Sequence, residues 1–470
     1  RGAVTKIARN GVGLATSVTE AFGAPEAGTT ATAYNDFGQP TQVTNPNGHI
    51  TTYDYFATGP QKGYLQKQSV DPEGLALTTT FDVDARGNVL AVTDPRGVRH
   101  ESVYNELDWL VESTQAASGA SSDHDPEGLA PALGYKTVYL YDEAGNVVEE
   151  RLPAGDDGTT YTRIQRDYGV LGEVLEERRE VTAGAFVATT TEYDAGFLPV
   201  RVTHPEGNYE EWEYDSRNQV RFHRRGLGTG ALPAPIQAEA LYNADGENVG
   251  TIDGRGLGWE QVRDGFGRPF RTVNPLAEYD ETTYDTGGMP GERRRVAAGA
   301  LLARQVTEFD LRGRPRTSSS YLWEAGGNDP RIPDDPSSAL VLETALVWDA
   351  DSRLLQTTDP LQRVTLAEYD AAGRRTAVQD AAGNRLDWTL DPAGNEIGTV
   401  AREVTPTGAA VEIESTAAFD ALGRPVVSTD AFGNRSRRTY DARGNVRLEI
   451  DAEGALTTST YDGLDRRTEV

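Results

Sequence analysis

The chain contains no cysteine, so it has neither a disulfide framework nor a thiolate metal site. No run of 18 or more apolar residues occurs, so no segment is suited to cross a bilayer as a helix. The first residues, RGAVTKIARNG, lack the apolar core of a signal peptide. We therefore predict no membrane span and no signal peptide in this segment, while the compartment stays open.

Lysine is nearly absent, and arginine supplies almost all of the positive charge. The 45 basic residues are outnumbered by 73 acidic ones, which gives a net charge of −28. A field of this sign repels nucleic acid, because binding requires cations that displace the counterions of the phosphates. We predict no nucleic-acid partner. The acidity serves either solubility or a surface for a basic partner, and both interpretations stay open.

Signatures of catalysis are also missing. The five histidines have no ligand-like spacing, and no nucleophile elbow, zinc-protease or phosphate-loop motif occurs. Pairs such as Asp82 and Asp84, or Asp349 and Asp351, lack the loop of a calcium site and fit turn chemistry better. We predict no enzyme activity, no catalytic residue, no cofactor and no metal. The histidines are His49, His100, His124, His204 and His223.

Glycine, in contrast, is abundant. The chain has 50 glycines in 470 residues, above the usual share of about 7%. Glycine adopts positive φ without steric cost, so this excess indicates many tight turns. The hydrophobic share of 37% and the mean hydropathy of −0.54 are lean for one thick core. These values favour an all-β chain with frequent turns over a helical bundle.

An aromatic residue followed by aspartate recurs along the chain, with glycine three residues after the aspartate. Several copies lie 21 residues apart, for example from Tyr369 to Leu390 and from Phe419 to Tyr440. We take these residues as the structural signature of a repeat. The signature residues are Phe309, Asp310, Gly313 and Arg314; Tyr369, Asp370, Gly373 and Arg374; Phe419, Asp420, Gly423 and Arg424; and Tyr440, Asp441 and Gly444.

A second turn signature lies half a period later. It reads Asp-Pro-x-Gly or a close variant, and the aspartates of both signatures follow one another at intervals of 10 or 11 residues. The clearest examples are Asn45–Gly48, Asp71–Gly74, Asp94–Gly97, His204–Gly207, Asp380–Gly383, Asp430–Gly433 and Asp451–Gly454.

Both signatures describe one turn. Aspartate at the first position accepts backbone N–H groups, and glycine at the fourth takes the left-handed conformation. A type I turn followed by such a residue connects hairpins through a G1 bulge. We therefore predict positive φ at Gly373, Gly383, Gly433 and Gly444. Strands of six or seven residues separate the turns, which makes the chain a near-continuous antiparallel meander.

The strands are weakly biased between their two faces, which suits a thin, wetted wall better than a sandwich core. The aromatic residue before each turn is expected to pack on its neighbours as an aromatic ladder. Thr182–Ala185, Ala297–Ala300 and Thr405–Gly408 are expected to close longer hairpins. Loops near 115–134, 226–236 and 324–338 are rich in Gly, Pro, Ser and Asp and read as insertions. We predict one continuous array over residues 1–470 that continues beyond both ends.

The signatures resemble the RHS/YD repeat family, whose pattern is Tyr-Asp-x-x-Gly-Arg followed by Thr-Asp-Pro-x-Gly. Tyr369–Arg374, Phe309–Arg314 and Phe419–Arg424 match the first half, and Thr93–Gly97 matches the second. The resemblance implies a long strip of β-hairpins that curls into a spiralling hollow cocoon. In bacterial members, including the C components of Tc toxins, the cocoon encloses a toxin. Teneurins and wall-associated proteins share the shell.

Three hypotheses follow. The first is a structural shell segment that encloses a polypeptide cargo, with the rest of its own shell and a toxin outside this chain as partners. The second is a cell-surface or secreted adhesive protein, and the third is an enzyme on a β-scaffold. Family shells end in an Asp-Pro-x-Gly-Leu segment that cleaves off the toxin. Asp71–Leu75 and Asp125–Leu129 match it locally, but a repeat turn explains them better. The first two hypotheses both imply an exported, secreted or cell-surface protein.

Overall fold

The computed structural model describes residues 2–118, 134–154, 160–228, 235–323, 335–405 and 410–470. Most of the three expected insertions, near 115–134, 226–236 and 324–338, lies outside the described residues. The same holds for His124, for Asp125–Leu129 and for most of the turn at Thr405–Gly408.

The described part of the chain is built almost entirely of short strands. The first ten are β1 (Lys6–Arg9), β2 (Ala15–Glu20), β3 (Gly28–Tyr34), β4 (Pro40–Thr44), β5 (Ile50–Tyr55), β6 (Leu65–Val70), β7 (Leu77–Val83), β8 (Val89–Thr93), β9 (Arg99–Tyr104) and β10 (Leu110–Ser118). The next ten are β11 (Tyr135–Tyr141), β12 (Val147–Pro153), β13 (Tyr161–Tyr168), β14 (Val174–Thr182), β15 (Ala185–Tyr193), β16 (Pro199–Thr203), β17 (Tyr209–Tyr214), β18 (Val220–Gly226), β19 (Ile236–Tyr242) and β20 (Asn248–Asp253).

The second half of the chain continues in the same way. Its first strands are β21 (Gly258–Arg263), β22 (Pro269–Val273), β23 (Tyr279–Tyr284), β24 (Pro290–Ala297), β25 (Ala300–Phe309), β26 (Pro315–Leu322), β27 (Leu340–Trp348), β28 (Leu354–Thr358) and β29 (Val364–Tyr369). The last are β30 (Arg375–Gln379), β31 (Arg385–Leu390), β32 (Glu396–Val404), β33 (Ala410–Phe419), β34 (Pro425–Thr429), β35 (Arg435–Tyr440), β36 (Val446–Ile450), β37 (Leu456–Thr458), β38 (Thr460–Tyr461) and β39 (Arg467–Glu469).

These strands form one long antiparallel sheet. Each strand from β1 to β37 pairs with its neighbours in sequence, so the sheet contains 37 strands, and β38 and β39 form a separate pair. The one helical element among the described residues is the 3₁₀ turn η1 (Pro336–Ser338). The expected all-β meander of hairpins is confirmed.

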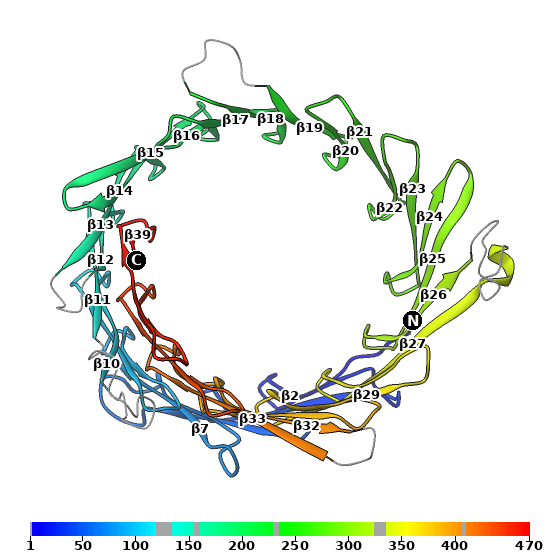
Figure 1. Cartoon of the computed structure of the whole chain (residues 1–470), viewed down its shortest axis with the longest axis horizontal. Coiled ribbons are helices and arrows are strands. Elements are labelled where there is room, and N and C mark those ends of the chain that lie inside the picture. The colour runs from blue at the N-terminus through cyan, green and yellow to red at the C-terminus, as the bar shows by residue number, and fades with distance from the viewer. Residues whose placement is uncertain (1, 119–133, 155–159, 229–234, 324–334, 406–409) are drawn as a thin grey trace.

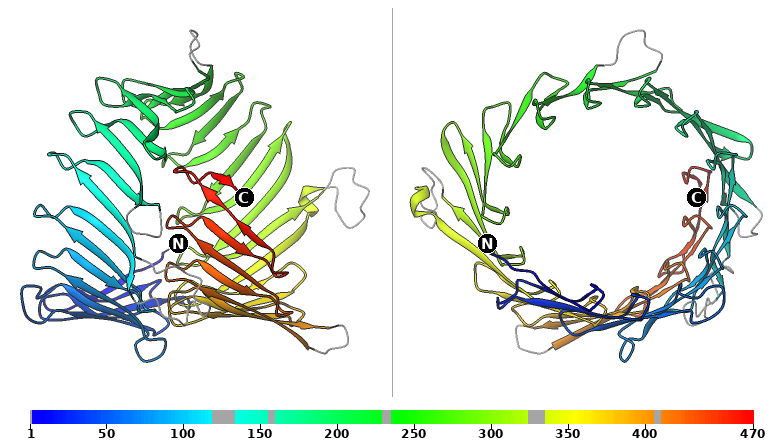
Figure 2. Two further views of the ribbon diagram at one scale, coloured as in Figure 1. Left: turned by 60° about the vertical axis from the view of Figure 1, so that its left-hand side comes forward. Right: turned by 180° about the vertical axis from the view of Figure 1, so that it is seen from behind.

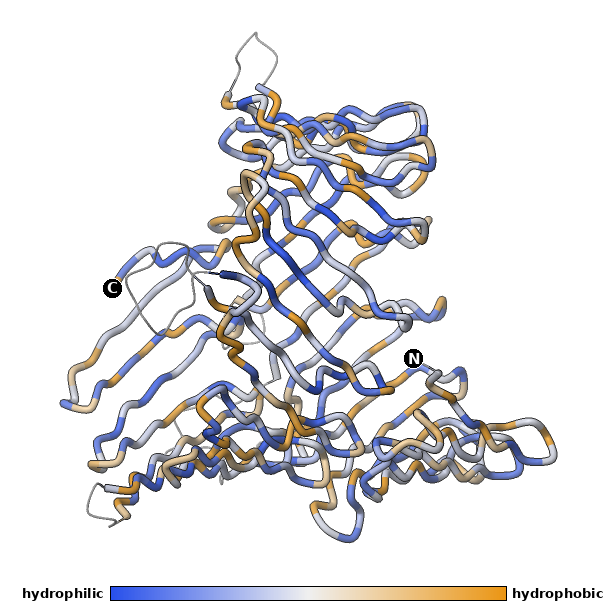
Figure 3. The backbone as a smooth tube through the Cα atoms, turned by 90° about the vertical axis from the view of Figure 1, so that its right-hand side faces the viewer, coloured by the Kyte–Doolittle hydropathy of each residue, from blue (hydrophilic) through white to orange (hydrophobic). Residues whose placement is uncertain are grey.

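The sheet is a curved strip, as Figure 1 shows. It winds through more than one turn, so the strands from β25 to β39 lie beside those from β2 to β14, offset along the spiral axis (Figure 2). Only thirteen apolar residues are buried in the described part of the chain, and no second layer covers the sheet. Polar and apolar residues mix along the backbone without an apolar layer (Figure 3). The expected thin wall is confirmed.

The strip has two edges, and the two turn signatures occupy different edges. The aromatic–Asp turns follow the odd-numbered strands, and finally β38, on one edge, here called the aromatic edge. The Asp-Pro-x-Gly turns follow the even-numbered strands on the other, here called the plain edge. The hairpin of β29 and β30 on the aromatic edge contains a register shift, whereas that of β30 and β31 on the plain edge does not. The register shift inserts one additional residue in the aromatic-edge hairpin. This additional residue explains why the intervals between successive turn aspartates are 11 and 10 residues.

Cross-strand ion pairs take the place of an apolar core on the faces. Arg166 on β13 contacts both Glu150 on β12 and Glu177 on β14, at 3.6 and 2.8 Å. On β31, Arg385 pairs with Glu368 and Asp387. An arginine that binds one carboxylate through two N–H groups, or binds two carboxylates at once, has a fixed orientation, because the planar guanidinium group matches the geometry of a carboxylate. The faces can therefore remain polar while neighbouring strands stay in register.

The turns have the expected conformation, with one correction. Gly373, Gly383, Gly433 and Gly444 have φ of +82°, +89°, +81° and +95°. In Asp71–Gly74, however, the glycine is not left-handed, so the prediction of the same turn there is wrong. This connection is one residue longer than that of Asp94–Gly97, and the left-handed conformation falls on Asp71 and on Ala76, which donates its N–H to Asp71 O.

Gly373→Ala is expected to lower the free energy of unfolding by about 1–2 kcal/mol, because a Cβ disfavours the left-handed conformation. The cost is conformational, since the added Cβ would meet only ordinary contacts with Arg353, at 3.8 Å. Gly398→Ala is the matched control: Gly398 is not left-handed, and its Cβ would also have ordinary contacts. Hydrogen exchange of amides in β29 and β30 measures the first change, and exchange of amides in β31 and β32 measures the second. Equal effects of the two changes would contradict the turn assignment.

Candidate functional site: the repeat turn and the seam between coils

The aspartate of each turn fixes the backbone around it. Asp380 shows the arrangement: its Oδ1 accepts the N–H groups of Ala382 and Asn384, both at 2.9 Å, and its Oδ2 accepts Asn384 Nδ2 at 2.7 Å. The side-chain bond from Asn384 and the backbone bonds lower the pKa of Asp380. The carboxylate is therefore the form that holds the turn.

Arginine at the fifth turn position connects one turn to the next. Arg374 donates Nε to Asp370 Oδ2 at 2.7 Å and Nη1 to Asp391 O, in the following aromatic-edge turn, at 2.8 Å. Arg314 and Arg424 make the same two bonds. Each donates Nε to the aspartate of its own turn and Nη1 to a carbonyl oxygen of the next turn, that of Asp349 or Asp441. The arginine of the signature thus stabilises its own turn and also binds the backbone of the next repeat.

The tyrosine of the signature binds the preceding strand. Tyr369, at the end of β29, donates its hydroxyl to Leu354 O, at the start of β28, at 3.0 Å. The backbone pairing of β28 with β29 ends at Gln356 and Leu366. The hydroxyl of Tyr369 therefore supplies a hydrogen-bond donor to Leu354 O, which lies past the last paired residue. Eleven tyrosines of the described residues make this bond, at 2.6–3.0 Å: Tyr34, Tyr55, Tyr141, Tyr168, Tyr193, Tyr214, Tyr242, Tyr284, Tyr369, Tyr440 and Tyr461.

The expected aromatic ladder is corrected by these contacts. Among the described residues, the ring pairs are Trp109 with Tyr141 and Trp212 with His223, and only the first involves a tyrosine of the signature. Three of the tyrosine rings, those of Tyr284, Tyr369 and Tyr440, instead lie under the guanidinium group of the preceding aromatic-edge turn, and Arg353 lies 5.1 Å from the centre of Tyr369. The spacing of one repeat separates successive rings too far for direct stacking, and arginine fills the space.

Sequence reasoning missed the repeats whose odd-numbered strands end at Tyr55, Tyr104, Tyr168 and Arg263. Arg263 stands where the other turns carry an aromatic residue, directly before Asp264, and its Nε and Nη2 donate to Asn248 O at 3.2 and 3.0 Å. It thereby replaces the tyrosine hydroxyl. The signal that could have found it was the turn that follows, Asp264–Gly267, in step with its neighbours.

Tyr369→Phe is expected to lower the free energy of unfolding by about 1–2 kcal/mol, because Leu354 O loses its donor. The matched control is Tyr104→Phe. Tyr104 occupies the same position at the end of β9, but its hydroxyl makes no hydrogen bond within the described part of the chain. Amide exchange in β28 and β29 reports the loss locally. A loss of the same size at Tyr104 would show that ring packing, and not the hydroxyl, stabilises the repeat.

Successive coils of the spiral meet along a seam. On one side are plain-edge residues of the first coil, and on the other are aromatic-edge turns of the second. Partners at the seam are 282 to 325 residues apart in sequence. Contacts at the seam therefore join repeats that lie about one coil apart.

Arginine and asparagine make polar contacts across the seam. Arg96, in the plain-edge turn Asp94–Gly97, donates to Asp420 O at 3.2 Å and to Ala421 O at 2.8 Å, and only 6% of its side chain is exposed. Asn47 occupies the same position in its own turn and donates to Asp349 Oδ2 at 2.9 Å. The third residue of a plain-edge turn is therefore the one that reaches the next coil.

An apolar cluster closes the seam beside Arg96. Val98 and Ala116 of the first coil are buried against Ala421 of the second, with Leu422 packed on them. Leu422 is the third residue of the aromatic-edge turn that Asp420 begins. Tips of turns, and not the faces of the sheet, thus form this core.

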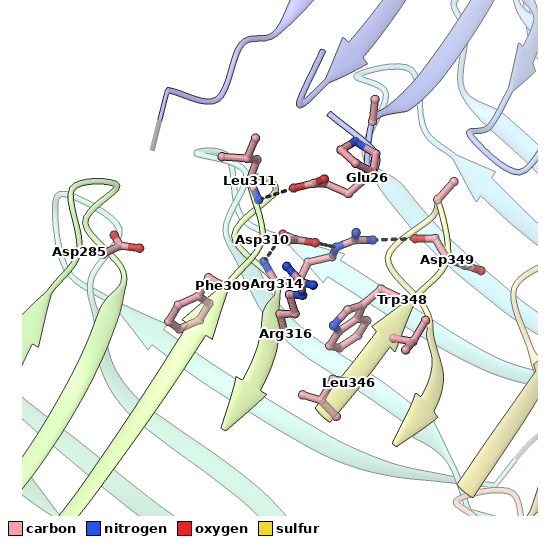
Figure 4. Close-up of a pocket in the computed structure, with 14 residues that line it drawn as sticks. Glu26, Asp285, Phe309, Asp310, Leu311, Arg314, Arg316, Leu346, Trp348 and Asp349 are labelled. Carbon is pink, nitrogen blue, oxygen red and sulfur yellow. Dashed lines mark hydrogen bonds and ion pairs between the residues drawn. The ribbon is translucent and has the colours of Figure 1, made fainter. Parts of the chain in front are cut away.

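The seam begins near the N-terminal strands, as Figure 4 shows. Glu26 Oε1 accepts Leu311 N at 2.9 Å, and Arg312 pairs with Glu20 at 2.8 Å. A pocket beside these contacts is lined by Phe309, Arg314 and Trp348, among others. Its acids and Arg314 are engaged in turn and seam contacts, so the pocket belongs to the wall.

Glu180 lies at the far end of the seam. Its carboxylate accepts Arg163 N and Nε, both at 3.0 Å, Arg163 Nη2 at 2.8 Å and Gly184 N at 2.7 Å. The Arg163 side chain is the main cause that lowers the pKa of Glu180 to about 2. Beside it, Val181 O accepts Gly463 N, from the second coil, at 2.7 Å.

This lowered pKa predicts a loss of stability in acid. A carboxyl whose pKa is lower in the folded state stabilises the fold above its ordinary value of 4.5, and the contribution disappears as the pH falls toward 2. In the wild type it amounts to about 2–3 kcal/mol.

Measuring the free energy of unfolding between pH 7 and pH 2 tests this. Glu180→Gln is expected to reduce it at pH 7 and to flatten its dependence below pH 4.5. Glu453→Gln, an exposed residue of another turn, is the control and should keep the wild-type slope. An unchanged slope for Glu180→Gln would contradict the assignment.

The residues that sequence analysis set aside as non-catalytic stay dispersed. Within the described ranges no group of three or more His, Cys, Asp or Glu side chains could hold a metal ion. His223 contacts Glu210 at 2.9 Å, and His100 accepts Ala116 N at 3.3 Å. The predicted absence of enzyme activity, cofactor and metal stays a prediction.

The fold and the turn chemistry define a protein of tandem β-hairpin repeats. Residues 348–385 and 419–455 match the family model described as RHS Repeat. These segments of the chain are RHS repeats, and the resemblance drawn from the turn signature is confirmed.

Relatives with this architecture are much longer than the chain. It is 24% identical over 403 residues to double-stranded DNA deaminase toxin A of Burkholderia cenocepacia (strain H111), a match that covers 76% of the chain and 26% of that protein. The crystal structure of TcdB2-TccC3-Cdc42 matches with a TM-score of 0.57 at 14% identity, over 97% of this chain and 28% of that one. A Tc holotoxin pore of Photorhabdus luminescens matches with a TM-score of 0.54 at 12% identity, over 99% and 27%. Both structures share the fold.

Proposed function

We propose that this chain is a segment of a shell that encloses a polypeptide cargo, with a toxin in another part of a longer protein. The observation that carries the proposal is the seam. A strip that only curved would leave a gap between its coils, whereas contacts at Arg96, Val98 and Gly463 join one coil to the next.

The wall is suited to containment. It is one sheet thick, so it encloses space with the fewest residues, and its polar faces need no second layer. The repeats run through all the described ranges, and we propose that residues 1–470 form one array. Its partners are the rest of its own shell and the cargo. The mechanism is steric: the segment keeps the cargo from solvent and from other proteins.

The comparisons support this proposal. The Burkholderia relative is named a toxin, and both structural neighbours are parts of assemblies whose names include TccC3 or Tc holotoxin. We further propose that the segment belongs to an exported, secreted or cell-surface protein and contributes no catalytic group. No helix in the described part of the chain is long and apolar enough to cross a membrane.

Limited proteolysis of the full natural protein that contains this segment tests the proposal. Any cargo should survive while exposed loops of the shell are cut. Arg96→Ala should expose the cargo several-fold faster, because two hydrogen bonds across the seam are lost.

Arg255→Ala is the matched control. Arg255 is also the third residue of a plain-edge turn and also binds the aspartate of its own turn, but 76% of its side chain is exposed. It should leave protection unchanged. The part of the wild-type protein outside this segment is also expressed alone and digested. If it is digested equally fast in the full protein and alone, the shell function is excluded.

A further inference from the structure

The backbone bonds of the turns identify which side chains lie on the concave face of the wall. Asp310 N donates to Arg314 O, so the backbone groups of Asp310 bond to the following strand and those of Phe309 to the preceding one. In Figure 4 the wall is seen from outside, with the strands of the opposite side behind it, and the chain runs from left to right with the aromatic edge at the top. For L-residues this orientation places the Phe309 side chain on the concave face. Because successive side chains alternate between faces, Glu308 lies on the convex face.

Two hollows adjoin on this face between β21 and β27. The first, of about 690 Å³, is lined by Arg316 and Trp348, and the second, of about 540 Å³, is lined by Arg293 and Tyr284. Phe309 lines both, so the two hollows form one groove across several strands, here called the concave groove. Coils of the spiral meet at their edges, so a neighbouring coil does not cover the face on which the groove lies.

The second hollow is present because two residues depart from the repeat. Phe309 has no hydroxyl, so it cannot make the bond to the preceding strand that tyrosine makes in other repeats. Gly291 follows the proline that begins β24, where the corresponding residues of β16, β22 and β34 are Val200, Phe270 and Val426. Gly291 lines the hollow and contributes no side chain to fill it. The two departures therefore open space within a regular wall.

The concave groove carries two arginines whose charge is not neutralised by an ion pair. Within the described part of the chain, neither Arg293 nor Arg316 makes a hydrogen bond or an ion pair, and both side chains are exposed. No carboxylate is among the described residues that line the second hollow, and Asp280, on the neighbouring strand, is bound by Arg295. The acids of the first hollow are held in turn and seam contacts. In a chain with a net charge of −28, the groove is thus a local site of positive charge.

We propose that the concave groove binds an extended acidic segment of the enclosed cargo, an inference that rests on the proposed shell function. A guanidinium group binds a carboxylate through two N–H groups, and the aromatic rings offer apolar surface to the rest of the segment. Arg293 and Arg316 lie two strands apart, roughly 15 Å from each other by the strand spacing and the rise per residue. Two acidic residues four positions apart on one face of an extended segment span about 13 Å, which the two long arginine side chains can reach.

Fluorescence anisotropy of this chain with short labelled peptides tests the site. One peptide carries two glutamates four positions apart, and a second carries lysines in their place. The glutamate peptide should bind, and more weakly as salt increases, because salt screens the ion pairs. The double variant Arg293→Gln and Arg316→Gln should bind it about tenfold more weakly. Arg294→Gln is the matched control, because Arg294 points to the convex face of the same strand and pairs with Glu292, and it should bind like the wild type.

Gly291→Val fills the second hollow without changing any charge. Gly291 is not left-handed, and an added Cβ would meet only ordinary contacts, the nearest at 3.9 Å, so the wall can accept the side chain. This variant should weaken binding of the glutamate peptide several-fold. The proposal is overturned by a wild type that does not bind the glutamate peptide, by equal binding of the lysine peptide, or by an equal loss in Arg294→Gln and in the double variant.

Cross-linking in the full natural protein identifies the occupant of the groove. This chain has no cysteine, so Gln305→Cys can carry a benzophenone label in the second hollow, and Glu308→Cys carries it on the convex face as the control. The groove label should attach to an acidic segment of the cargo, and the control label should not. If the cargo is protected from protease but the groove label attaches to a basic segment or to no part of it, the inference is wrong and the shell function stands. If the cargo is digested as fast as it is alone, the shell function is wrong and the inference fails with it.

Discussion

The structure depends on one interaction: a turn aspartate that accepts two backbone N–H groups through Oδ1. At Asp380 these bonds come from Ala382 and Asn384, and Oδ2 holds the Asn384 side chain. With the turn fixed, the two strands it joins have only one register. Because each strand then pairs with its sequence neighbours, the register of the whole sheet follows from local turns. No long-range apolar core is required to select it.

The difference between the two edges gives the strip its curvature. The hairpins of the aromatic edge contain a bulge, whereas those of the plain edge do not, with the exceptions of β14–β15, β18–β19 and β24–β25. A bulge bends its strand and increases the local twist, so bulges repeated on one edge act in the same direction. On this edge the tyrosine hydroxyls and signature arginines join successive hairpins, so the bend of one repeat is transmitted to the next. We infer that the spiral results from this asymmetry.

Turn chemistry made much of the fold predictable from sequence, because its cause is local. The left-handed glycines and the meander follow from residues three positions apart, the aspartate and the glycine of each turn. Gly74 departs because one additional residue moves the left-handed position to Ala76, and Arg263 departs because a guanidinium can replace a hydroxyl. The seam could not be predicted, since its partners lie about a coil apart and their pairing depends on the pitch of the spiral. The Asp94–Gly97 motif gave no sign that Arg96 would be buried.

The location of the buried residues connects the fold to the proposed function. Val98, Ala116 and Ala421 are buried at the seam, and Asp420 lies there with only 2% of its surface exposed. The faces of the sheet are held by ion pairs such as that of Arg385 with Glu368. A face pair can change to another polar pair at little cost, because exposed pairs contribute little individually. A change at the seam alters buried groups. The edges therefore carry the stability of the wall, which leaves its faces free to vary with whatever the wall encloses.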